Sequence, residues 1–414
     1  LILKTVILFR NYPKIRESYQ LRWKYIHIDE YQDTNSAQHE LTRLLTGPSK
    51  NICAVGDGDQ NIYSWRGANV QNILNFENDY AGARTILLEE NYRSTQTILS
   101  VANEIIKKNT MRKDKNLFTK NIVGGKIGLI ESYNEGEEAR VVGEKIKNII
   151  ASGTLPENIA VLYRANFQSR ALEESFLIMG IPYQVLGVRF FERKEVKDIL
   201  SYIRAAENPD SFSDIKRIID CPPRGIGKNT LAKMFAKDEM GLSPAAQKRA
   251  QEFWKLLRDI KEYATTEKAS DIIKFVSERT GIEASLKTGR EEDTERLENI
   301  HELVTLASKY NILPPEEAVE KLLEDAALAS DQDSLIKNES AIKLMTVHAA
   351  KGLEFPFVFV TGLEQDLFPH RRMETDAVSK GTEEEERRLF YVAITRAKEK
   401  LYLSCASVRT IFGQ

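Results

Sequence analysis

Short apolar runs alternate, along most of the chain, with longer segments whose apolar positions recur at helical spacing. This alternation is typical of an α/β architecture. Charged or polar residues follow several of the apolar runs, and ligands of open parallel sheets bind beyond the carboxyl ends of the strands. We therefore expect a site at those ends. The predicted strands are residues 25–28, 52–55, 85–88, 159–163, 342–347, 357–361 and 401–404.

The stretch from about Ser211 to Glu339 breaks this pattern. It contains almost no β-rich runs, and its apolar positions predict one helix after another, separated by polar loops. A helical block that interrupts an α/β pattern indicates an inserted domain. Residues 1–9 predict an amphipathic helix, and because the sequence opens within it and without a methionine, we expect a fragment of a longer protein.

Composition narrows the possible function classes. The 414 residues are 42% hydrophobic, which is ample for two or three domains with their own cores. Charged residues make up 29% and nearly cancel, for a formal net charge of −2. A protein that coats DNA by charge alone would be basic overall. Any nucleic-acid binding must therefore come from local patches and stacking surfaces.

The cysteines and the lack of long apolar runs lead us to expect a cytoplasmic protein. Cys53, Cys221 and Cys405 are odd in number and far apart, which argues against a disulfide framework or a zinc site and fits a reducing cytosol. No apolar run approaches the roughly 18 residues of a membrane span. No signal peptide is visible either.

The string IHIDEYQDTN, residues 26–35, delivers two adjacent carboxylates, Asp29 and Glu30, at the tip of a predicted strand. A nucleotide-hydrolysing site needs such a pair: one carboxylate holds Mg²⁺, directly or through water, and the other orients or deprotonates the attacking water. A lone acidic pair would more simply be an acidic turn. The longer string favours the nucleotide site.

The string VGDGDQNIYSWRGA, residues 55–68, combines a polar sensor with an aromatic platform. Gln60 follows a Gly-Asp turn and can touch a γ-phosphate. Tyr63, Trp65 and Arg66 can form a surface on which exposed bases stack, each stack contributing about 1–3 kcal/mol. The alternative is that both aromatic residues pack in a core. The polar and small neighbours argue against that alternative.

Three further strings place a cation beside an aromatic or a small residue. In LEENYRS, residues 88–94, Tyr92 can stack on a nucleobase and Arg93 can reach a phosphate. In LMTVHAAKGLEF, residues 344–355, small residues around His348 and Lys351 permit close approach of a phosphodiester backbone, although a lone histidine is more often structural. In EEERRLFYVAITRAK, residues 384–398, the charge order suits a helix dipole, and Arg396 can act as an arginine finger.

In order and spacing, these five strings resemble motifs II to VI of the UvrD/PcrA/Rep family of superfamily 1A DNA helicases, with the PcrA branch nearest. The resemblance covers essentially the entire chain. It includes the intervening strings YRANFQSR at 163–170, GVRFFERKE at 187–195 and PPRGIG at 222–227.

The resemblance implies a role for each candidate residue. At the nucleotide, Asp29 and Glu30 would form the metal pair, with Asp29 holding Mg²⁺ and Glu30 activating water. Gln60 would sense the γ-phosphate, Arg93 would contact phosphate and Arg396 would be the arginine finger. Tyr92 would stack near the adenine, and Glu354 would lie near the sugar. The residues implied to contact DNA are Tyr63, Trp65, Arg66, Phe190, His348, Lys351 and the turn Gly225, Ile226 and Gly227. Exposed backbone N–H groups of that turn can meet phosphates.

The implied fold is α/β, with RecA-like P-loop NTPase domains, one partial and one complete, and an inserted all-helical domain. Residues 1–93 would be the C-terminal part of domain 1A. Residues 94–204 and 341–414 would form domain 2A. Residues 205–340 would be the helical domain 2B, which is shorter than the family leads us to expect.

The implied activity is that of an ATP-dependent helicase and translocase that moves 3′ to 5′ and unwinds duplex DNA in repair or replication. ATP and Mg²⁺ would be its cofactors, and single-stranded DNA and a duplex junction its partners. We expect a monomer that does not bind membranes. Loading or accessory proteins of repair or replication would be its further partners. No G-x-x-x-x-G-K-[ST] string occurs in the sequence, so the phosphate-binding loop would lie before Leu1. We expect the chain alone to hydrolyse no ATP.

Two other interpretations stay open. The chain can be the DNA-binding helicase portion of a helicase–nuclease, whose nuclease domain would follow Gln414. It can also be a non-enzymatic DNA-binding module, or an interaction protein, that borrowed the fold. The acidic pair, Gln60 and Arg396 argue against a non-enzymatic role, because binding alone needs none of them.

Overall fold

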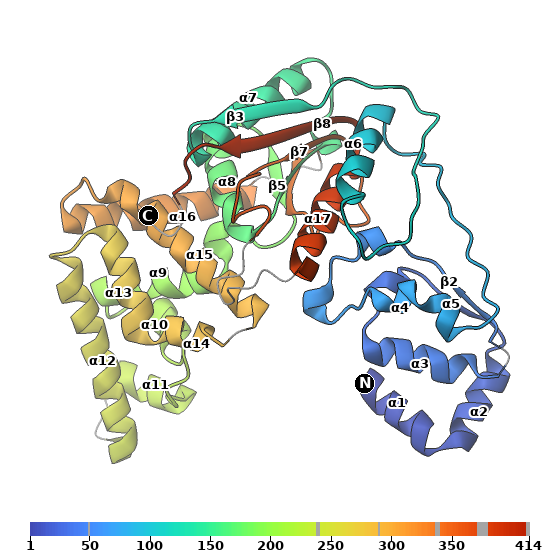
Figure 1. The fold of residues 1–414 in the computed structure, drawn as a ribbon. Helices are drawn as coiled ribbons and strands as arrows, with labels where there is room; N and C mark the ends of the chain where they lie inside the picture. The colour runs from blue at the N-terminus through green and yellow to red at the C-terminus, as the bar shows by residue number, and fades with distance from the viewer. Residues whose placement is uncertain (49, 237–240, 289, 336–339, 371–379, 411–414) are drawn as a thin grey trace. The chain divides into compact units, whose positions relative to one another are not determined.

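The computed structural model describes residues 1–414 apart from 49, 237–240, 289, 336–339, 371–379 and 411–414. Strands and helices alternate through most of the described chain, and a long run of helices interrupts them (Figure 1). This order confirms the predicted α/β class with a helical block. The chain divides into two compact units. Unit 1 comprises Leu1–Glu131, Asn158–Arg164 and Met345–Cys405, and unit 2 comprises Ser132–Glu157, Ala165–Leu344 and Ala406–Gln414.

The first part of unit 1 contains a small parallel sheet, in which β1 pairs with β2 and Ile26 lies opposite Ile52. Helix α3 begins with a capping box, in which the side chains of Asn35 and Gln38 each accept from the other's backbone N–H. Such a box satisfies two N–H groups that a helix start leaves without partners. The elements here are α1 (Ile2–Asn11), α2 (Pro13–Arg22), β1 (Ile26–Ile28), α3 (Ser36–Thr46), β2 (Ile52–Ala54), α4 (Gln71–Leu74) and α5 (Phe76–Asp79).

The strand predicted at residues 85–88 is wrong. These residues have no regular secondary structure, and the side chains of Ile86 and Leu88 are 67% and 82% exposed. An apolar run becomes a strand only where a neighbouring strand pairs with its backbone N–H and C=O groups. In the described part of the chain, the nearest such pairing is one isolated bridge between Glu90 and Phe118.

The larger sheet has the strand order β3-β8-β7-β4-β6-β5. The pairs β4–β7, β7–β8 and β5–β6 are parallel. Every residue of β4 is buried, as expected for a parallel strand that is covered on both faces. The strands are β3 (Gly128–Ser132), β4 (Ile159–Tyr163), β5 (Tyr183–Val185), β6 (Ile342–Thr346), β7 (Phe355–Val360) and β8 (Ala397–Ala406), with helices α6 (Gln96–Ile106), α7 (Glu135–Ala151), α8 (Ser169–Ile178) and α17 (Lys380–Ile394) in the same region of the sequence.

The helical block packs around α9, which contacts α10, α12, α13 and α15. Val196, Ile199 and Tyr202 of α9 are fully buried in one apolar core. A buried ion pair between Arg170 and Glu302 joins α8 to α15 within unit 2. The helices are α9 (Lys194–Glu207), α10 (Phe212–Ile218), α11 (Lys228–Phe235), α12 (Pro244–Ala264), α13 (Ala269–Thr280), α14 (Ile282–Leu286), α15 (Glu291–Ala307) and α16 (Pro315–Leu335).

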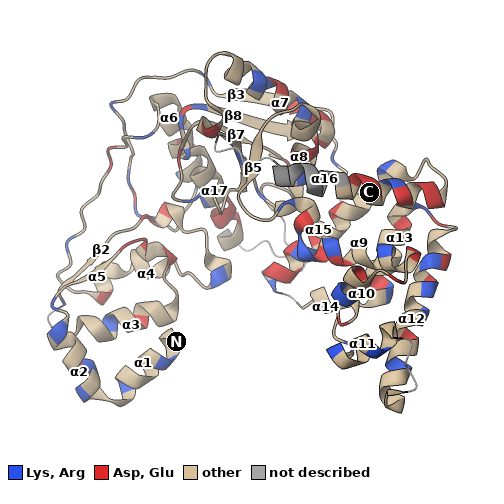
Figure 2. Cartoon of the chain, turned by 180° about the vertical axis from the view of Figure 1, so that it is seen from behind, with Lys and Arg blue, Asp and Glu red and all other residues tan. Residues whose placement is uncertain are grey.

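Charge is spread over both units and not concentrated in one sign. Figure 2 shows acidic and basic residues interspersed along most helices. Across the described ranges, the helices are either too short or too polar for a membrane crossing.

The division into domains at residues 93, 204 and 340 stays a prediction.

Candidate active site

The acidic pair lies directly after β1, at the carboxyl edge of the small sheet. Asp29 and Glu30 are both exposed. Glu30 adopts a left-handed backbone conformation, with φ of 50°, which is sterically unfavourable for a residue with a side chain. The Asp29 carboxylate accepts the Glu30 N–H at 2.9 Å, and the Glu30 carboxylate accepts the side-chain amide of Gln32. The turn is therefore held by its own polar groups, with both carboxylates open to solvent.

Gln60 lies beside this pair, because β1 and β2 are parallel neighbours and end at the same edge. The short 3₁₀ helix η2 (Gly58–Gln60) follows β2, and the Gln60 side-chain amide donates to Asp57 at 3.0 Å. Gln32 bridges the two turns, since its side-chain oxygen accepts the Asp57 N–H at 2.9 Å. A side chain at Gly56 would place its Cβ 2.4 Å from that oxygen, so the close approach requires glycine here.

Lys351 connects this edge to the segment that follows β6. Its ammonium binds the Asp33 carboxylate, donates to the Gln60 carbonyl at 2.8 Å and lies 3.7 Å from a Glu30 oxygen. Burial raises the pKa of Asp33, against the opposing effect of Lys351. We expected Lys351 to contact DNA. In the structure its ammonium is bound among the motif II and motif III residues, and the contact with DNA stays a prediction.

The stacking residues do come together. Tyr63 and Trp65 lie with ring centroids 6.3 Å apart, and the Arg66 guanidinium lies 4.5 Å from the Trp65 ring. His348 joins them from the segment after β6, with its ring 6.2 Å from both aromatic rings. The Tyr63 hydroxyl donates to the His348 carbonyl at 3.1 Å. Each of these side chains except Arg66 is only partly exposed, so the cluster is a preformed surface and not a set of free side chains.

Burial and two nearby guanidinium groups keep His348 neutral. Burial contributes most and Arg164 and Arg66 add to it, lowering the pKa of His348 to about 3. A neutral ring fits its hydrogen bond with the backbone of Ile62. His348 thus joins the two segments as a polar, uncharged group.

A second ionic group lies around Glu354. Its carboxylate accepts from Arg93 and lies 2.6 Å from Lys398, and these contacts, Lys398 first, lower its pKa to about 2. Arg93 also donates to the Thr395 carbonyl at 3.3 Å. Tyr92 is 79% exposed, so its ring is open to a planar ligand.

Arg396 lies between the end of α17 and the start of β8, not within the predicted helix. Its side chain is buried and donates to the carbonyls of Val392 and Leu353 and to the Thr395 hydroxyl. Burial, followed by the repulsion of Arg93, lowers the pKa of Arg396 to about 10. All of these acceptors are neutral. A buried cation held by neutral groups is typical of an anion-binding or catalytic position.

Two predicted DNA contacts are not available as we expected. Phe190 is only 1% exposed and belongs to the apolar core of unit 2, where it packs edge-on against Phe191. The N–H of Gly225 already donates to the Asp220 carboxylate at 2.9 Å. Ile226 is buried, whereas Gly227 is exposed at the start of α11. The Gly225 N–H is therefore already bonded, and the contact of the other N–H groups of this turn with DNA stays a prediction.

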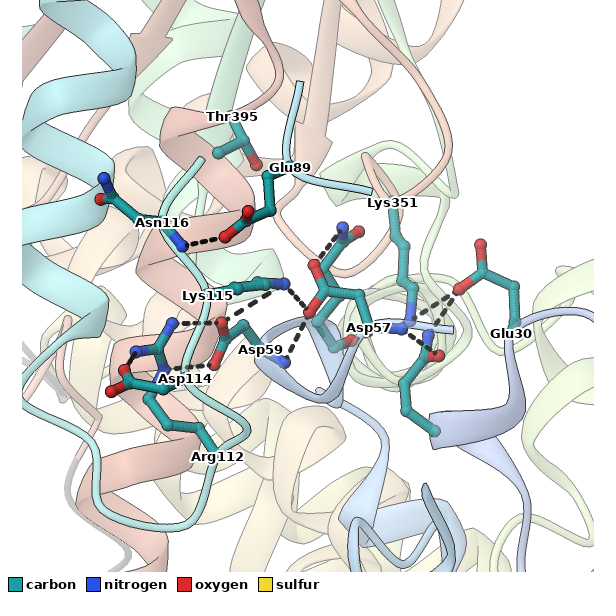
Figure 3. Close-up of polar contacts among 12 residues, drawn as sticks. Glu30, Asp57, Asp59, Glu89, Arg112, Asp114, Lys115, Asn116, Lys351 and Thr395 are labelled. Carbon is teal, nitrogen blue, oxygen red and sulfur yellow. Dashed lines mark hydrogen bonds and ion pairs between the residues drawn. The ribbon is translucent and has the colours of Figure 1, made fainter. Parts of the chain in front are cut away.

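Sequence reasoning missed several charged residues of the site. Asp57 and Asp59 received no role, and Arg112 and Lys115 lie in a stretch that matched no motif. Figure 3 shows these side chains in contact beside Lys351 and Glu30. No periodicity or spacing in that stretch indicates which cation meets which carboxylate, so the sequence offers no signal for them.

The carboxylates fit a Mg²⁺ site that is completed by other ligands. No group of three or more metal-binding side chains occurs among the residues that the structure describes. Mg²⁺ is commonly held by one or two carboxylates, with water and substrate phosphates as its remaining ligands. The exposed oxygens of Asp29 and Glu30 match that requirement.

At one edge of the small parallel sheet, the acidic pair and Gln60 thus meet Lys351 from a distant segment. The chain belongs to the UvrD-like helicase family. The family's C-terminal domain, described as the UvrD-like helicase C-terminal domain, matches residues 86–408, and the UvrD/REP helicase N-terminal domain matches residues 1–81. These matches confirm the family resemblance and the fold class.

Curated relatives agree with this assignment. The chain is 42% identical over 435 residues to a protein named ATP-dependent DNA helicase PcrA from Staphylococcus aureus (strain MRSA252), covering 100% of the chain and 59% of the relative. It is also 42% identical over 433 residues to a protein of the same name from Staphylococcus epidermidis, with the same coverage. The chain thus spans 59% of the length of these relatives.

Proposed function

We propose that this chain is the greater part of an ATP-dependent DNA helicase and translocase that moves 3′ to 5′ and acts in repair or replication. The observation that carries the proposal is the meeting of three segments at one sheet edge. The acidic pair, Gln60 and Lys351 come from distant parts of the sequence and share hydrogen bonds or close ionic contacts. A non-enzymatic DNA-binding module would need no such arrangement.

Each residue has a chemical task in this proposal. Mg²⁺, when bound by Asp29, neutralises charge on the phosphates. Glu30 orients the attacking water and accepts its proton, and Gln60 offers a polar group to the same water or to the γ-phosphate. Arg93 and Arg396 offset the charge that develops on the phosphoryl oxygens. Tyr92 supplies a ring for the adenine.

One short stretch couples the nucleotide to the DNA strand. Gln60, at the nucleotide, and Trp65, on the stacking surface, lie on the same segment after β2. Tyr63 and His348 tie that segment to the segment after β6 through the hydrogen bond between the Tyr63 hydroxyl and the His348 carbonyl. A shift of Gln60 during hydrolysis would therefore move the stacked bases. Alternating grip on the strand converts such shifts into steps.

An unwinding assay tests this function. Partial duplexes with either a 3′ or a 5′ single-stranded tail are incubated with ATP, Mg²⁺ and a form of the protein that includes a phosphate-binding loop. We expect strand separation with the 3′ tail only. Separation with neither tail, under conditions where the protein binds both, would refute the proposal. Separation with the 5′ tail alone would refute the polarity.

The 414-residue chain by itself should turn over no ATP. Its sequence contains no G-x-x-x-x-G-K-[ST] string, so it lacks the lysine and the backbone cradle that hold the phosphates. Phosphate release in the presence of ATP, Mg²⁺ and single-stranded DNA measures this. Turnover stimulated by the DNA would mean that other residues of the chain bind the phosphates.

We further propose that the protein acts as a cytoplasmic monomer.

A further inference from the structure

The stretch 109–116, here called the connector, follows α6 and has no regular helix or strand (Figure 3). It matched none of the motifs. Some of its polar contacts nevertheless tie it to two functional elements of unit 1. One is the turn η2, which carries Gln60. The other is helix α17, which ends shortly before Arg396.

Arg112 anchors the connector on η2. Its guanidinium donates to both carboxylate oxygens of Asp59, at 3.0 and 2.9 Å. The two side chains are 7% and 1% exposed. A bidentate pair fixes orientation as well as distance. Since burying two charges costs free energy that only good geometry offsets, this pair sets where the connector lies.

Lys115 then acts on the neighbouring carboxylate, Asp57. Its ammonium binds one oxygen of Asp57 and lies 3.4 Å from Asp59. The same Asp57 oxygen accepts the Asp59 N–H at 2.9 Å, and the other accepts the side-chain amide of Gln60 at 3.0 Å. Burial raises the pKa of Asp57, but Lys115, together with the hydrogen bonds from Gln60 and the Asp59 N–H, outweighs it, so the pKa is lowered and Asp57 stays ionised.

An ionised carboxylate determines how Gln60 is oriented. It can only accept hydrogen bonds, so it must face the NH₂ group of Gln60 and not the carbonyl. The carbonyl oxygen of Gln60 is thereby directed away from Asp57, where it can accept a hydrogen bond from water. If Asp57 were protonated, it could donate to that carbonyl, and the amide could turn over.

The other end of the connector is bound to α17. The Glu384 carboxylate accepts the Thr110 N–H at 2.8 Å, the Thr110 hydroxyl at 2.7 Å and the Met111 N–H at 3.2 Å. Arg388 donates to the Met111 carbonyl at 3.1 Å. The connector is therefore held between the turn with Gln60 and the helix that leads to Arg396.

We propose that Lys115 is a positioning residue: through Asp57 it sets the orientation in which Gln60 meets the attacking water. The connector ties this orientation to the helix that precedes Arg396. The inference rests on the proposed ATP hydrolysis, because Gln60 has a task only in that reaction.

The test compares Lys115→Met with Lys113→Met in a form of the protein that includes a phosphate-binding loop. Lys113 lies two residues earlier and contacts Glu77 and Thr85, away from Gln60, so it is a matched control. We expect Lys115→Met to lower kcat for DNA-stimulated ATP hydrolysis by roughly 10- to 100-fold, as misplaced catalytic groups do. The KM for ATP should change little. Lys115→Arg should recover most of kcat, and Lys113→Met should match the unsubstituted protein.

The pH profile separates positioning from a structural role. Without Lys115, burial is opposed only by the hydrogen bonds from Gln60 and the Asp59 N–H, so the pKa of Asp57 should rise. The kcat of Lys115→Met should therefore fall further as the pH is lowered from 8 toward 5.5. Equal kcat and pH profiles for the two methionine variants would overturn the inference. So would a loss that follows the unfolded fraction and is not restored by arginine. If Glu30→Gln in the same assay left turnover intact, the proposed function itself would fail.

Discussion

Acidification should loosen the stacking surface through His348. The folded protein holds the pKa of this ring at about 3, mainly by burial, and an unfolded histidine titrates near 6.5. Between pH 6.5 and 3, His348 binds a proton in the unfolded chain but not in the folded chain. The free energy of unfolding therefore falls as the pH is lowered. The loss is absent well above pH 6.5. It amounts to about 1.4 kcal/mol at pH 5.5 and about 2.7 kcal/mol at pH 4.5.

His348→Gln isolates this contribution, because glutamine keeps a polar side chain and does not titrate. Urea unfolding is followed by the emission of Trp65, which lies against His348, after Trp23 and Trp254 are replaced by phenylalanine. Between pH 7.5 and 4.5, the free energy of unfolding should fall by about 2.7 kcal/mol more in the protein with His348 than in the glutamine variant. Parallel losses in the two proteins would refute the reasoning, as would a His348 pKa near 6.5 by NMR.

Three further predictions concern other parts of the chain. Arg112→Met removes the bidentate partner of the buried Asp59 carboxylate, which then keeps only Lys115 at 3.4 Å, and should lower the free energy of unfolding by about 3–5 kcal/mol in urea titrations; a loss below 1 kcal/mol would contradict the anchoring role. Arg170→Met should cost a similar amount in unit 2, because Glu302 would remain buried without its cation; hydrogen exchange of α8 and α15 reports it. Trp65→Ala should weaken single-stranded DNA binding by about 1–3 kcal/mol in fluorescence anisotropy, whereas Trp23→Ala should not.

The strand predictions were correct where the hydrophobic pattern of a segment agrees with its packing in the structure. Residues 159–163 are apolar throughout and form β4, with every side chain buried. The prediction at residues 85–88 failed because an apolar pattern does not say whether a partner strand is at hand. Strand β5 was missed because three residues are too few to show an alternation, and β3 was missed because its two apolar residues are adjacent.

The site was predictable as a set of motifs but not as a set of contacts. The hydrophobic pattern placed the acidic pair and Gln60 shortly after predicted strands, because local chain geometry decides where a strand ends. It could not show that Lys351 binds Asp33, because that contact depends on tertiary packing. The same holds for Phe190, whose burial in the core of unit 2 no local pattern reveals.

The most direct measurement of the central claim is ATP turnover by the Glu30→Gln variant of a form of the protein that includes a phosphate-binding loop. The change keeps the size and polarity of the side chain and removes the carboxylate that would accept the proton from water. The account predicts that DNA-stimulated turnover is lost while single-stranded DNA is bound as tightly as before. Undiminished turnover would contradict the account, because the acidic pair after β1 would then not be the catalytic centre.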